Sequence, residues 1–379
     1  MNCKKSLRLH KEKGGKLEIK SKFKLENKED LSIAYTPCVA EVCRVIAKNK
    51  KLAKQYTIKK NTVAVVSNGS AVLGLGNIGA EAAIPVMEGK AILFKAFANI
   101  DAFPICLDEN NPDEIVRIIK SIAPVFGGIN LEDIAAPDCF YIEKQLQNIG
   151  IPVTHDDQHG TAVVVMAAFI NAVKALNRKM SLLKIVIVGA GAAGTAIAEM
   201  LAREFKLKDI IVCDSKGIIS KSRTDLNFAK KQLLKITNKE NISGKMEDAL
   251  AGADVFVGVS KGNILSQKMI KEMNERPIIF AMANPIPEIM PDLAKKAGAG
   301  IIGTGRSDFP NQINNVLVFP GLFRGALDGG FTKITDKMKF IAAETIADCV
   351  KHPTPNRILP SPLDKSVAKA IARNIVKKC

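Results

Sequence analysis

Acidic side chains follow two short apolar runs in the first half of the chain, at points where parallel strands would end. Glu132 and Asp133 come after the run 125–130, and Asp156 and Asp157 follow a second run. Functional sites of α/β proteins form at the carboxyl edge of the sheet, so two such strand ends would bring these side chains together. Clustered carboxylates repel one another unless a cation lies between them, and oxygen ligands suit Mg²⁺ or Mn²⁺. For any one of these acids alone, capping of the following helix is the simpler interpretation.

A zinc site is the weaker alternative for the same region. The segment 155–159 (HDDQH) has the histidine spacing of the zinc-binding HExxH helix, with Asp in place of Glu. That site needs both histidines on one face of a helix. Here the segment leaves a strand, Gly160 follows at once, and Asp is shorter than Glu. The context therefore argues against zinc.

A glycine-rich turn near the middle of the chain predicts a dinucleotide site. The apolar run 183–188 leads into this turn, and the next apolar run ends in Asp214. The turn consists of Gly189, Ala190, Gly191, Ala192, Ala193 and Gly194. Its first glycine allows the tight turn, its second lets a pyrophosphate approach, and its third allows close packing of helix on strand. The helix that follows would offer free N–H groups to the phosphates, and Asp214 is placed to hold a ribose hydroxyl.

A second G-x-G-x-x-G pattern, at 74–79, competes for this role. It follows the apolar run 62–66, but the segment 67–70 (SNGS) interrupts the run before the glycines. The next strand candidate ends in Asp108, too late in the chain for the fingerprint spacing. We therefore interpret 74–79 as a structural turn in a separate domain.

A metal held by carboxylates beside a dinucleotide suggests oxidation of a substrate that chelates the metal, such as a 2-hydroxy acid. With a carboxylate at carbon 3, the same metal would stabilise the enolate left when CO₂ departs. The reaction needs a base for the hydroxyl proton and an acid for the enol carbon. A lysine with a depressed pKa and a tyrosine suit these roles. Tyr35 and Lys90 are candidates, although spacing alone selects neither.

The elements that must position these residues form an alternating α/β pattern. Strand-like runs alternate with helical stretches from 62 to 153, which predicts a first α/β unit. A helix over 160–176 leads to a second unit, whose strands at 184–188, 209–214, 253–259, 277–281, 300–303 and 316–319 predict a doubly wound parallel sheet. We expect an N-terminal α/β substrate domain (1–158), a Rossmann-type dinucleotide domain (159–330) and C-terminal helices packed back on the body (331–379).

Composition is that of an ordinary globular protein with excess positive charge. The net charge is +17, but most basic residues are lysines spread along the chain, and aromatic residues make up only 5%. Arginine and aromatic side chains are the usual readers of nucleic acid, so we expect no nucleic-acid partner. No apolar run is long enough to span a membrane, and the scattered cysteines indicate free thiols. We expect a cytoplasmic protein without a membrane partner.

Seven short blocks of the sequence resemble the malic enzymes. They are 33–37 (IAYTP), 74–79 (GLGNIG), 85–90 (PVMEGK), 129–133 (INLED), 155–161 (HDDQHGT), 284–288 (NPIPE) and 314–321 (NNVLVFPG). The likeness is greatest to the short bacterial form, covers nearly the whole chain and follows the family's order. It implies a substrate domain followed by a dinucleotide domain, which agrees with the interpretation of 74–79.

The resemblance implies oxidative decarboxylation of L-malate to pyruvate and CO₂, with reduction of NAD(P) and a requirement for Mg²⁺ or Mn²⁺. Tyr35 matches the general acid that protonates enolpyruvate. Lys90 matches the base that takes the hydroxyl proton of malate, and it would also contact this substrate. The family suggests a homodimer, in which a neighbouring copy completes the tyrosine or the lysine.

The resemblance also assigns binding residues. The residues that match metal ligands are Glu132, Asp133 and Asp157. Asn284 and Asn315 match residues that hold the substrate and the nicotinamide end of the coenzyme. Asp156 would support the site through hydrogen bonds to its neighbours.

The choice of coenzyme and two rival functions stay open at this point. Asp214 favours NAD, because its charge would repel the 2′-phosphate of NADP. Lys216, Lys221 and Arg223 follow closely and could accept that phosphate, so NADP is the alternative. One rival function is another dinucleotide dehydrogenase, acting on amino acids or folates, for which no metal is needed. The other is a basic nucleic-acid-binding or scaffold protein.

Overall fold

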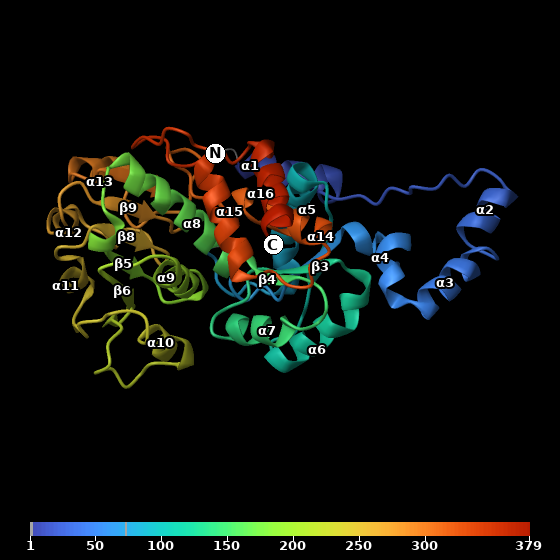
Figure 1. Cartoon of the computed structure of the whole chain (residues 1–379), viewed down its shortest axis with the longest axis horizontal. Helices are drawn as coiled ribbons and strands as arrows, with labels where there is room; N and C mark the ends of the chain where they lie inside the picture. Colours follow the sequence, from blue (N-terminus) through green and yellow to red (C-terminus); the bar gives the residue numbers. More distant parts are fainter. Residues whose placement is uncertain (1–2, 73) are drawn as a thin grey trace.

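The computed structural model describes residues 3–72 and 74–379 and contains two sheets with a layer of helices between them (Figure 1). The first sheet consists of β1 (Thr62–Ser67), β2 (Asp101–Cys106), β3 (Gly128–Leu131) and β4 (Val153–His155). The strand order is β2-β1-β3-β4, and all neighbouring strands are parallel. The predicted first α/β unit with parallel strands is therefore confirmed.

Helices cover both faces of the first sheet. Val63 and Val65 pack with α5 (Ala80–Ala98), whereas the alternate residues of β1 pack with α6 (Pro112–Ile122) and α7 (Asp138–Leu146). Successive side chains of a strand point to opposite faces, so β1 is buried on both sides, and its central residues 63–66 are all apolar. The short helix η3 (Ala123–Val125) precedes β3.

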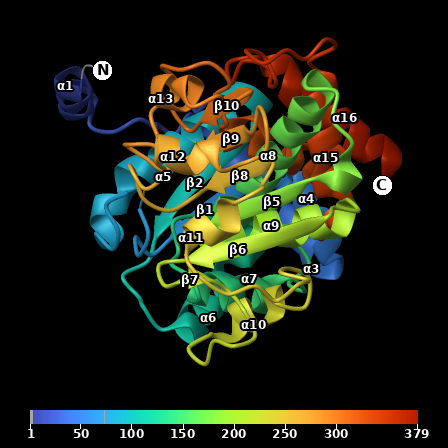
Figure 2. The same cartoon turned by 90° about the vertical axis from the view of Figure 1, so that its left-hand side faces the viewer.

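The second sheet has the predicted doubly wound arrangement. Its strands are β5 (Lys184–Val188), β6 (Asp209–Asp214), β7 (Gly217–Ile218), β8 (Val255–Gly258), β9 (Ile278–Ala281) and β10 (Ile301–Thr304). The order is β10-β9-β8-β5-β6-β7, which Figure 2 shows as a stack of strands, and only the β6–β7 pair is antiparallel among the described residues. The chain leaves β5 toward β6 on one side and later returns to β8 on the other. This switch point is where ligands bind in such sheets.

Five helices accompany the second sheet, and one predicted strand is absent from it. The helices are α9 (Ala192–Glu204), α10 (Phe228–Leu233), α11 (Met246–Leu250), α12 (Gln267–Lys271) and α13 (Pro291–Lys296). The prediction of a strand at 316–319 is wrong, because this segment belongs to η5 (Asn315–Leu317) and the start of α14 (Phe319–Asp328). Asn314 caps η5 through a bond to the N–H of Val316, and Pro320 suits the first turn of a helix.

A helical layer joins the two sheets. The long helix α8 (Asp156–Ala175) is buried along most of its length, with η4 (Met180–Leu182) after it, and it packs against α9 and α15 (Asp336–Asp348). The last helix, α16 (Lys365–Lys378), packs against α14, α15 and α5. One continuous apolar core therefore includes residues of both sheets and of the C-terminal helices.

The N-terminal segment departs from this compact arrangement. It contains α1 (Cys3–Lys13), α2 (Lys28–Ala34), α3 (Val39–Lys48), η1 (Lys50–Leu52), α4 (Ala53–Tyr56) and η2 (Ile58–Asn61). We refer to residues 17–56 as the arm, which projects from the body and carries α2 at its far end (Figure 1). No residue of the arm is buried. Among the described residues, no helix has the length and apolar character to span a membrane.

Candidate active site

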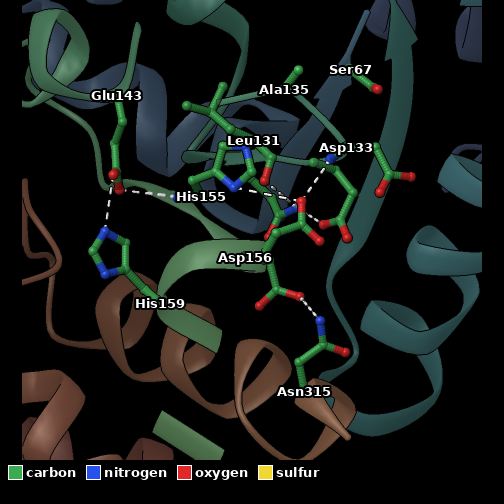
Figure 3. A network of polar contacts seen from close by, with 12 residues as sticks. Ser67, Leu131, Asp133, Ala135, Glu143, His155, Asp156, His159 and Asn315 are labelled. Carbon is green, nitrogen blue, oxygen red and sulfur yellow. Dashed lines mark hydrogen bonds and ion pairs between the residues drawn. The ribbon is translucent and has the colours of Figure 1, made fainter. Parts of the chain in front are cut away.

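The carboxyl ends of β3 and β4 lie next to each other and carry the four predicted acids. The last residues of the two strands are paired in register. Glu132 and Asp133 follow β3 directly, whereas Asp156 and Asp157 form the first turn of α8. Parallel pairing of these strand ends therefore brings together acids that lie far apart in the sequence (Figure 3).

Glu132, Asp133 and Asp157 form a compact set of oxygen donors. Each presents a carboxylate oxygen, and these atoms lie within 4.8 Å of one another. Asp133 has a φ of 52°, and its backbone N–H donates to Oδ2 of Asp157 at 2.8 Å. Asn130 donates from Nδ2 to Oε2 of Glu132 at 2.8 Å. The geometry and the all-oxygen chemistry of this set fit Mg²⁺ or Mn²⁺.

The electrostatics of the donor set also fit a dication. Burial, and then repulsion by a neighbouring carboxylate, raises the pKa values of Glu132 and Asp157. Lys90 acts in the opposite direction but does not cancel this effect. A bound dication would favour the charged form of each carboxylate, because it would replace repulsion by attraction.

Lys90 reaches the cluster from α5. Its Nζ lies 2.9 Å from Oε1 of Glu132, 2.6 Å from Oδ2 of Asp156 and 4.3 Å from the ring centre of Phe319. The side chain is only 8% exposed. Burial alone would lower the pKa of Lys90, but the charges of Asp156 and Glu132 raise it above its ordinary value. This is the opposite of the depressed pKa expected from the sequence, because two carboxylates face the ammonium group.

Asp156 connects Lys90 to the second half of the chain. Its Oδ2 accepts hydrogen bonds from Nζ of Lys90 and from Nδ2 of Asn315, the latter at 2.5 Å (Figure 3). The side chain of Asp156 is almost fully buried. Sequence reasoning missed one requirement here: a Cβ at Gly160 would overlap the carboxylate of Asp156. Glycine at that position therefore leaves room for the Lys90–Asp156–Asn315 contacts.

Glu143 of α7 supports the same strand end from behind and was also missed. Its carboxylate accepts the backbone N–H of His155 at 3.0 Å and lies 2.9 Å from Nε2 of His159 (Figure 3). Lys339 of α15 lies 3.1 Å from Nδ1 of the same histidine. Despite burial, the neighbouring His159 lowers the pKa of Glu143 to about 2. Both ring nitrogens of His159 are therefore engaged, which agrees with the argument against zinc.

Tyr35 does not join this cluster within the chain. It ends α2 on the arm and is 68% exposed, whereas Lys90 is buried in the body. Figure 1 shows α2 at the far end of the arm, well separated from α5 and α8. The structure thus brings together all predicted residues of the metal and lysine site except the tyrosine.

Asn284 lies in the loop after β9, at the carboxyl edge of the second sheet. The buried carboxylate of Glu288 accepts N–H groups from Ala283 at 3.0 Å and from Ser260 at 3.1 Å, and so joins the loops after β9 and β8. A Cβ at Gly74 would overlap the carbonyl oxygen of Asn284. The segment 74–79 therefore packs against this loop, in agreement with its interpretation as a structural turn.

The 189–194 turn has the geometry expected for a dinucleotide. It connects β5 to α9, and Gly189 has a φ of 118°. A Cβ at Gly194 would overlap the carbonyl oxygen of Gly189, whereas a Cβ at Gly191 would have open space around it. The turn is thus closed toward the protein and open on the side where a pyrophosphate would approach. Asp214 ends β6 as predicted, but Arg223 and Lys230 already pair with its carboxylate.

Comparisons with known proteins identify the same two halves. Residues 158–379 match the NAD-binding domain of malic enzyme, and residues 14–112 and 109–147 match the N-terminal domain of malic enzyme. The bifunctional malic/malolactic enzyme of Bacillus subtilis is 53% identical over 98% of this chain and 92% of that protein. An NADP-dependent malic enzyme of Haemophilus influenzae is 50% identical over 88% of this chain, which covers 44% of that longer protein.

A solved structure agrees in fold as well as in sequence. The NAD-dependent malic enzyme of Thermotoga maritima has a TM-score of 0.95 and 50% identity, and the alignment covers 98% of each chain. The relatives named here thus include enzymes of both coenzyme types. These matches show that the chain is an NAD(P)-dependent oxidoreductase that belongs to the malic enzyme family.

Proposed function

We propose that the chain catalyses the oxidative decarboxylation of L-malate to pyruvate and CO₂, with reduction of NAD or NADP and with Mg²⁺ or Mn²⁺ bound. The observation that carries the proposal is the ion pairing of buried Lys90 with Glu132 and Asp156 beside the three-carboxylate donor set. Asn315 bonds to Asp156 from the second half of the chain. Asp156 and Lys90 therefore link Asn315 in the second half of the chain to the donor Glu132, which supports a metal-assisted hydride transfer between the two halves.

Glu132, Asp133 and Asp157 are the residues that would hold the metal. When bound, the metal supplies polarisation of the oxygen on carbon 2, and the nicotinamide supplies the hydride acceptor. The protein contributes the fixed position of the donors, which Asn130 and the backbone N–H of Asp133 hold in place. We assign Asn284 and Asn315 to the substrate and the nicotinamide end of the coenzyme.

Lys90 is the residue that we assign to the hydroxyl proton of malate. The charges of Asp156 and Glu132 raise its pKa, and a dication bound to Glu132 would oppose that effect and favour the neutral amine that a base requires. Asp156 and Glu132 hold its Nζ from two sides, and the Phe319 ring lies beside it. A side chain held in this way keeps the geometry of proton transfer without further ordering. Asp156 in turn is held by Asn315, so that the lysine is positioned by residues from both halves of the chain.

We assign protonation of the enol carbon to Tyr35 of a second copy of the chain, in a homodimer. The arm has no buried residue, yet it exposes large apolar side chains that include Leu25, Leu31, Ile33 and Tyr35. Such a surface is unfavourable in water and is typical of a segment that packs on another subunit. Exchange of an arm between identical subunits is a low-cost route to a dimer.

The reaction is tested with purified protein, L-malate, Mn²⁺ and either coenzyme. We expect reduced coenzyme, pyruvate and CO₂ in equal amounts, and loss of all three after metal removal with EDTA. Lys90→Ala should lower kcat by about 10²–10⁴-fold, the usual contribution of a positioned proton-transfer group. Lys95→Ala is the matched control, since Lys95 lies on the same helix but is half exposed and pairs with Asp101. Normal turnover in Lys90→Ala, or full activity without metal, would contradict the proposal.

A further inference from the structure

The carboxylate cluster of the candidate site has little positive charge to offer an anionic substrate. Glu132, Asp133, Asp156 and Asp157 lie there with a single ammonium group, that of Lys90. With a dication bound, four negative charges would still face only three positive ones. L-malate is a dianion and adds further negative charge at a largely buried place, where unpaired charge is costly. We therefore expect a further cation beside the substrate.

The first sheet provides no such cation. The segments that follow β1, β2 and β3 (68–79, 107–111 and 132–137) contain neither lysine nor arginine, and β4 leads directly into α8. In the second sheet, the segment after β9 that carries Asn284 has no basic residue either. The strands on the two sides of β9 are β8 and β10. Lys261 follows β8 and Arg306 follows β10, so these two residues are the candidates.

Arg306 contacts the Asn284 loop, whereas Lys261 is exposed and has no hydrogen-bond partner among the described residues. Nη1 of Arg306 donates to the carbonyl oxygen of Pro285 at 3.2 Å. A Cβ at Gly305 would lie 2.9 Å from Nδ2 of Asn284, so the two loops pack closely. Arg306 is therefore the cation that the fold places next to a residue assigned to the substrate.

The segment 305–314 also connects Arg306 to the metal half of the site. It leads directly into Asn315, whose Nδ2 donates to Oδ2 of Asp156 at 2.5 Å. One segment thus begins beside Asn284 and ends at a residue that contacts the carboxylate cluster. This connectivity favours a position of Arg306 at the substrate rather than elsewhere on the sheet edge.

The guanidinium group of Arg306 is held in place but keeps unused donors. Nε and Nη2 donate to the carboxylate of Asp308 at 2.9 Å and 2.6 Å, and Cζ lies 5.2 Å from the ring centre of Phe309. Together with the bond to Pro285, these contacts leave one N–H donor on each terminal nitrogen without a partner among the described residues. Two parallel N–H donors of this kind form the fork that binds a carboxylate.

We propose that Arg306 binds the carboxylate on carbon 1 of L-malate and so determines specificity for 2-hydroxy acids. This inference rests on the proposed function and adds the cation that its substrate needs. The carboxylate on carbon 4 leaves as CO₂, so a cation paired with it would oppose the loss of its charge. The carboxylate on carbon 1 stays in pyruvate, and an ion pair with it stabilises substrate and transition state alike. Asp308 is a positioning residue, because it orients the guanidinium group.

Two fragments of the substrate distinguish the carboxylates. L-lactate keeps the hydroxyl group and the carboxylate on carbon 1, whereas 3-hydroxypropanoate keeps the hydroxyl group and the carboxylate on carbon 4. Calorimetry measures the binding of each to protein that holds Mn²⁺ and reduced coenzyme, which prevents turnover. Arg306→Gln should weaken L-lactate binding by at least about tenfold and leave 3-hydroxypropanoate unchanged. The KM for L-malate should rise by at least about tenfold, with kcat within about twofold of wild type.

Three further variants separate substrate binding from a structural role. Arg306→Lys keeps the charge without the fork, so its KM should lie between those of wild type and Arg306→Gln, and it keeps the test valid if Arg306→Gln does not fold. Asp308→Asn removes an ion pair of a half-exposed acid and leaves the free donors, so KM should rise by no more than about threefold. Lys261→Gln is the matched control and should leave KM unchanged.

The outcomes are distinguishable from failure of the proposed function. Unchanged KM and unchanged L-lactate binding in Arg306→Gln would overturn this inference and leave the reaction intact. Weaker binding of 3-hydroxypropanoate alone would overturn it too, because Arg306 would then contact the other carboxylate. An equal rise of KM in Asp308→Asn and Arg306→Gln would show a structural role only. If wild-type protein formed no pyruvate from L-malate, the proposed function itself would be contradicted.

Discussion

At the scale of single residues, the glycines of the 189–194 turn serve three different purposes. Gly189 adopts a φ of 118°, a conformation that residues with a Cβ rarely reach. Gly194 packs so closely that a Cβ would overlap the carbonyl oxygen of Gly189. A Cβ on Gly191, in contrast, would meet no described protein atom within 4 Å. The first and third glycines are therefore required by the fold. The fold does not require the second, and we expect its purpose to be the close approach of the coenzyme pyrophosphate.

Alanine substitutions should separate these requirements. Gly194→Ala is expected to lower the free energy of unfolding by about 1–3 kcal/mol, the usual cost of an overpacked site. Gly191→Ala should leave the melting temperature unchanged but weaken coenzyme binding at least about tenfold, because its methyl group enters the path of the pyrophosphate. Thermal unfolding without coenzyme and calorimetry with ADP-ribose measure the two effects. Wild-type affinity in Gly191→Ala would show that the pyrophosphate does not pass over this turn.

At the scale of secondary structure, the junction of β4 and α8 positions most of the site. Asp156 and Asp157 lie in its first helical turn, where they extend toward Lys90 and the metal donors. Glu143 holds the junction from α7 through the N–H of His155. From the other side, Lys339 of α15 contacts His159. Contacts from α5 through Lys90, from α7 through Glu143 and from α15 through Lys339 thus fix one helix start, which favours precise placement of its carboxylates.

Removing the Glu143 carboxylate should make the position of the metal donors less fixed, although Glu143 is not itself a donor. Glu143→Ala leaves the buried N–H of His155 without its acceptor, so we expect about tenfold weaker Mn²⁺ binding. Glu143→Gln keeps an acceptor oxygen and should restore most of the affinity. Electron paramagnetic resonance of free Mn²⁺ gives the dissociation constants. Glu114→Ala, on the exposed face of α6, controls for loss of an acidic charge. Equal Mn²⁺ affinity in Glu143→Ala and wild type would contradict a positioning role.

At the level of secondary structure, the sequence predicts some features of the site and of the fold but not others. The carboxylate cluster was predictable, because acids at the ends of neighbouring parallel strands must meet at one edge. The ion pairs of Asp214 were not predictable, because Lys230 lies on α10 and is brought to Asp214 by tertiary packing rather than by a local sequence pattern. The apolar residues of 316–319 predict a strand, but the Asn314 cap and Pro320 favour a helix there. Side-chain contacts that arise from tertiary packing leave no short-range pattern in the sequence from which they could be predicted.

At the scale of the whole molecule, the arm and the body have opposite characters. Both sheets and the C-terminal helices contribute to one continuous core, whereas no residue from 17 to 56 is buried. An arm that exposes leucine, isoleucine and tyrosine side chains gains stability only by packing on another surface. The missing acid of the proposed reaction lies on that arm. The proposed homodimer with exchanged arms would therefore account both for the exposed apolar surface of the arm and for the position of Tyr35 outside the Lys90 cluster.

Two defective variants, combined in one dimer, test this exchange. Lys90→Ala and Tyr35→Phe homodimers should both have low kcat. We expect a heterodimer, co-expressed with two different tags and purified through both, to recover about half of the wild-type turnover. This follows because exchange of arms places both substitutions in one site and leaves the other intact. If Tyr35 served its own chain, every site would carry one defect, and the heterodimer would be no more active than its parents. Light scattering of the wild-type protein must show a dimer, since a monomer with full activity would leave Tyr35 without a second copy to act on.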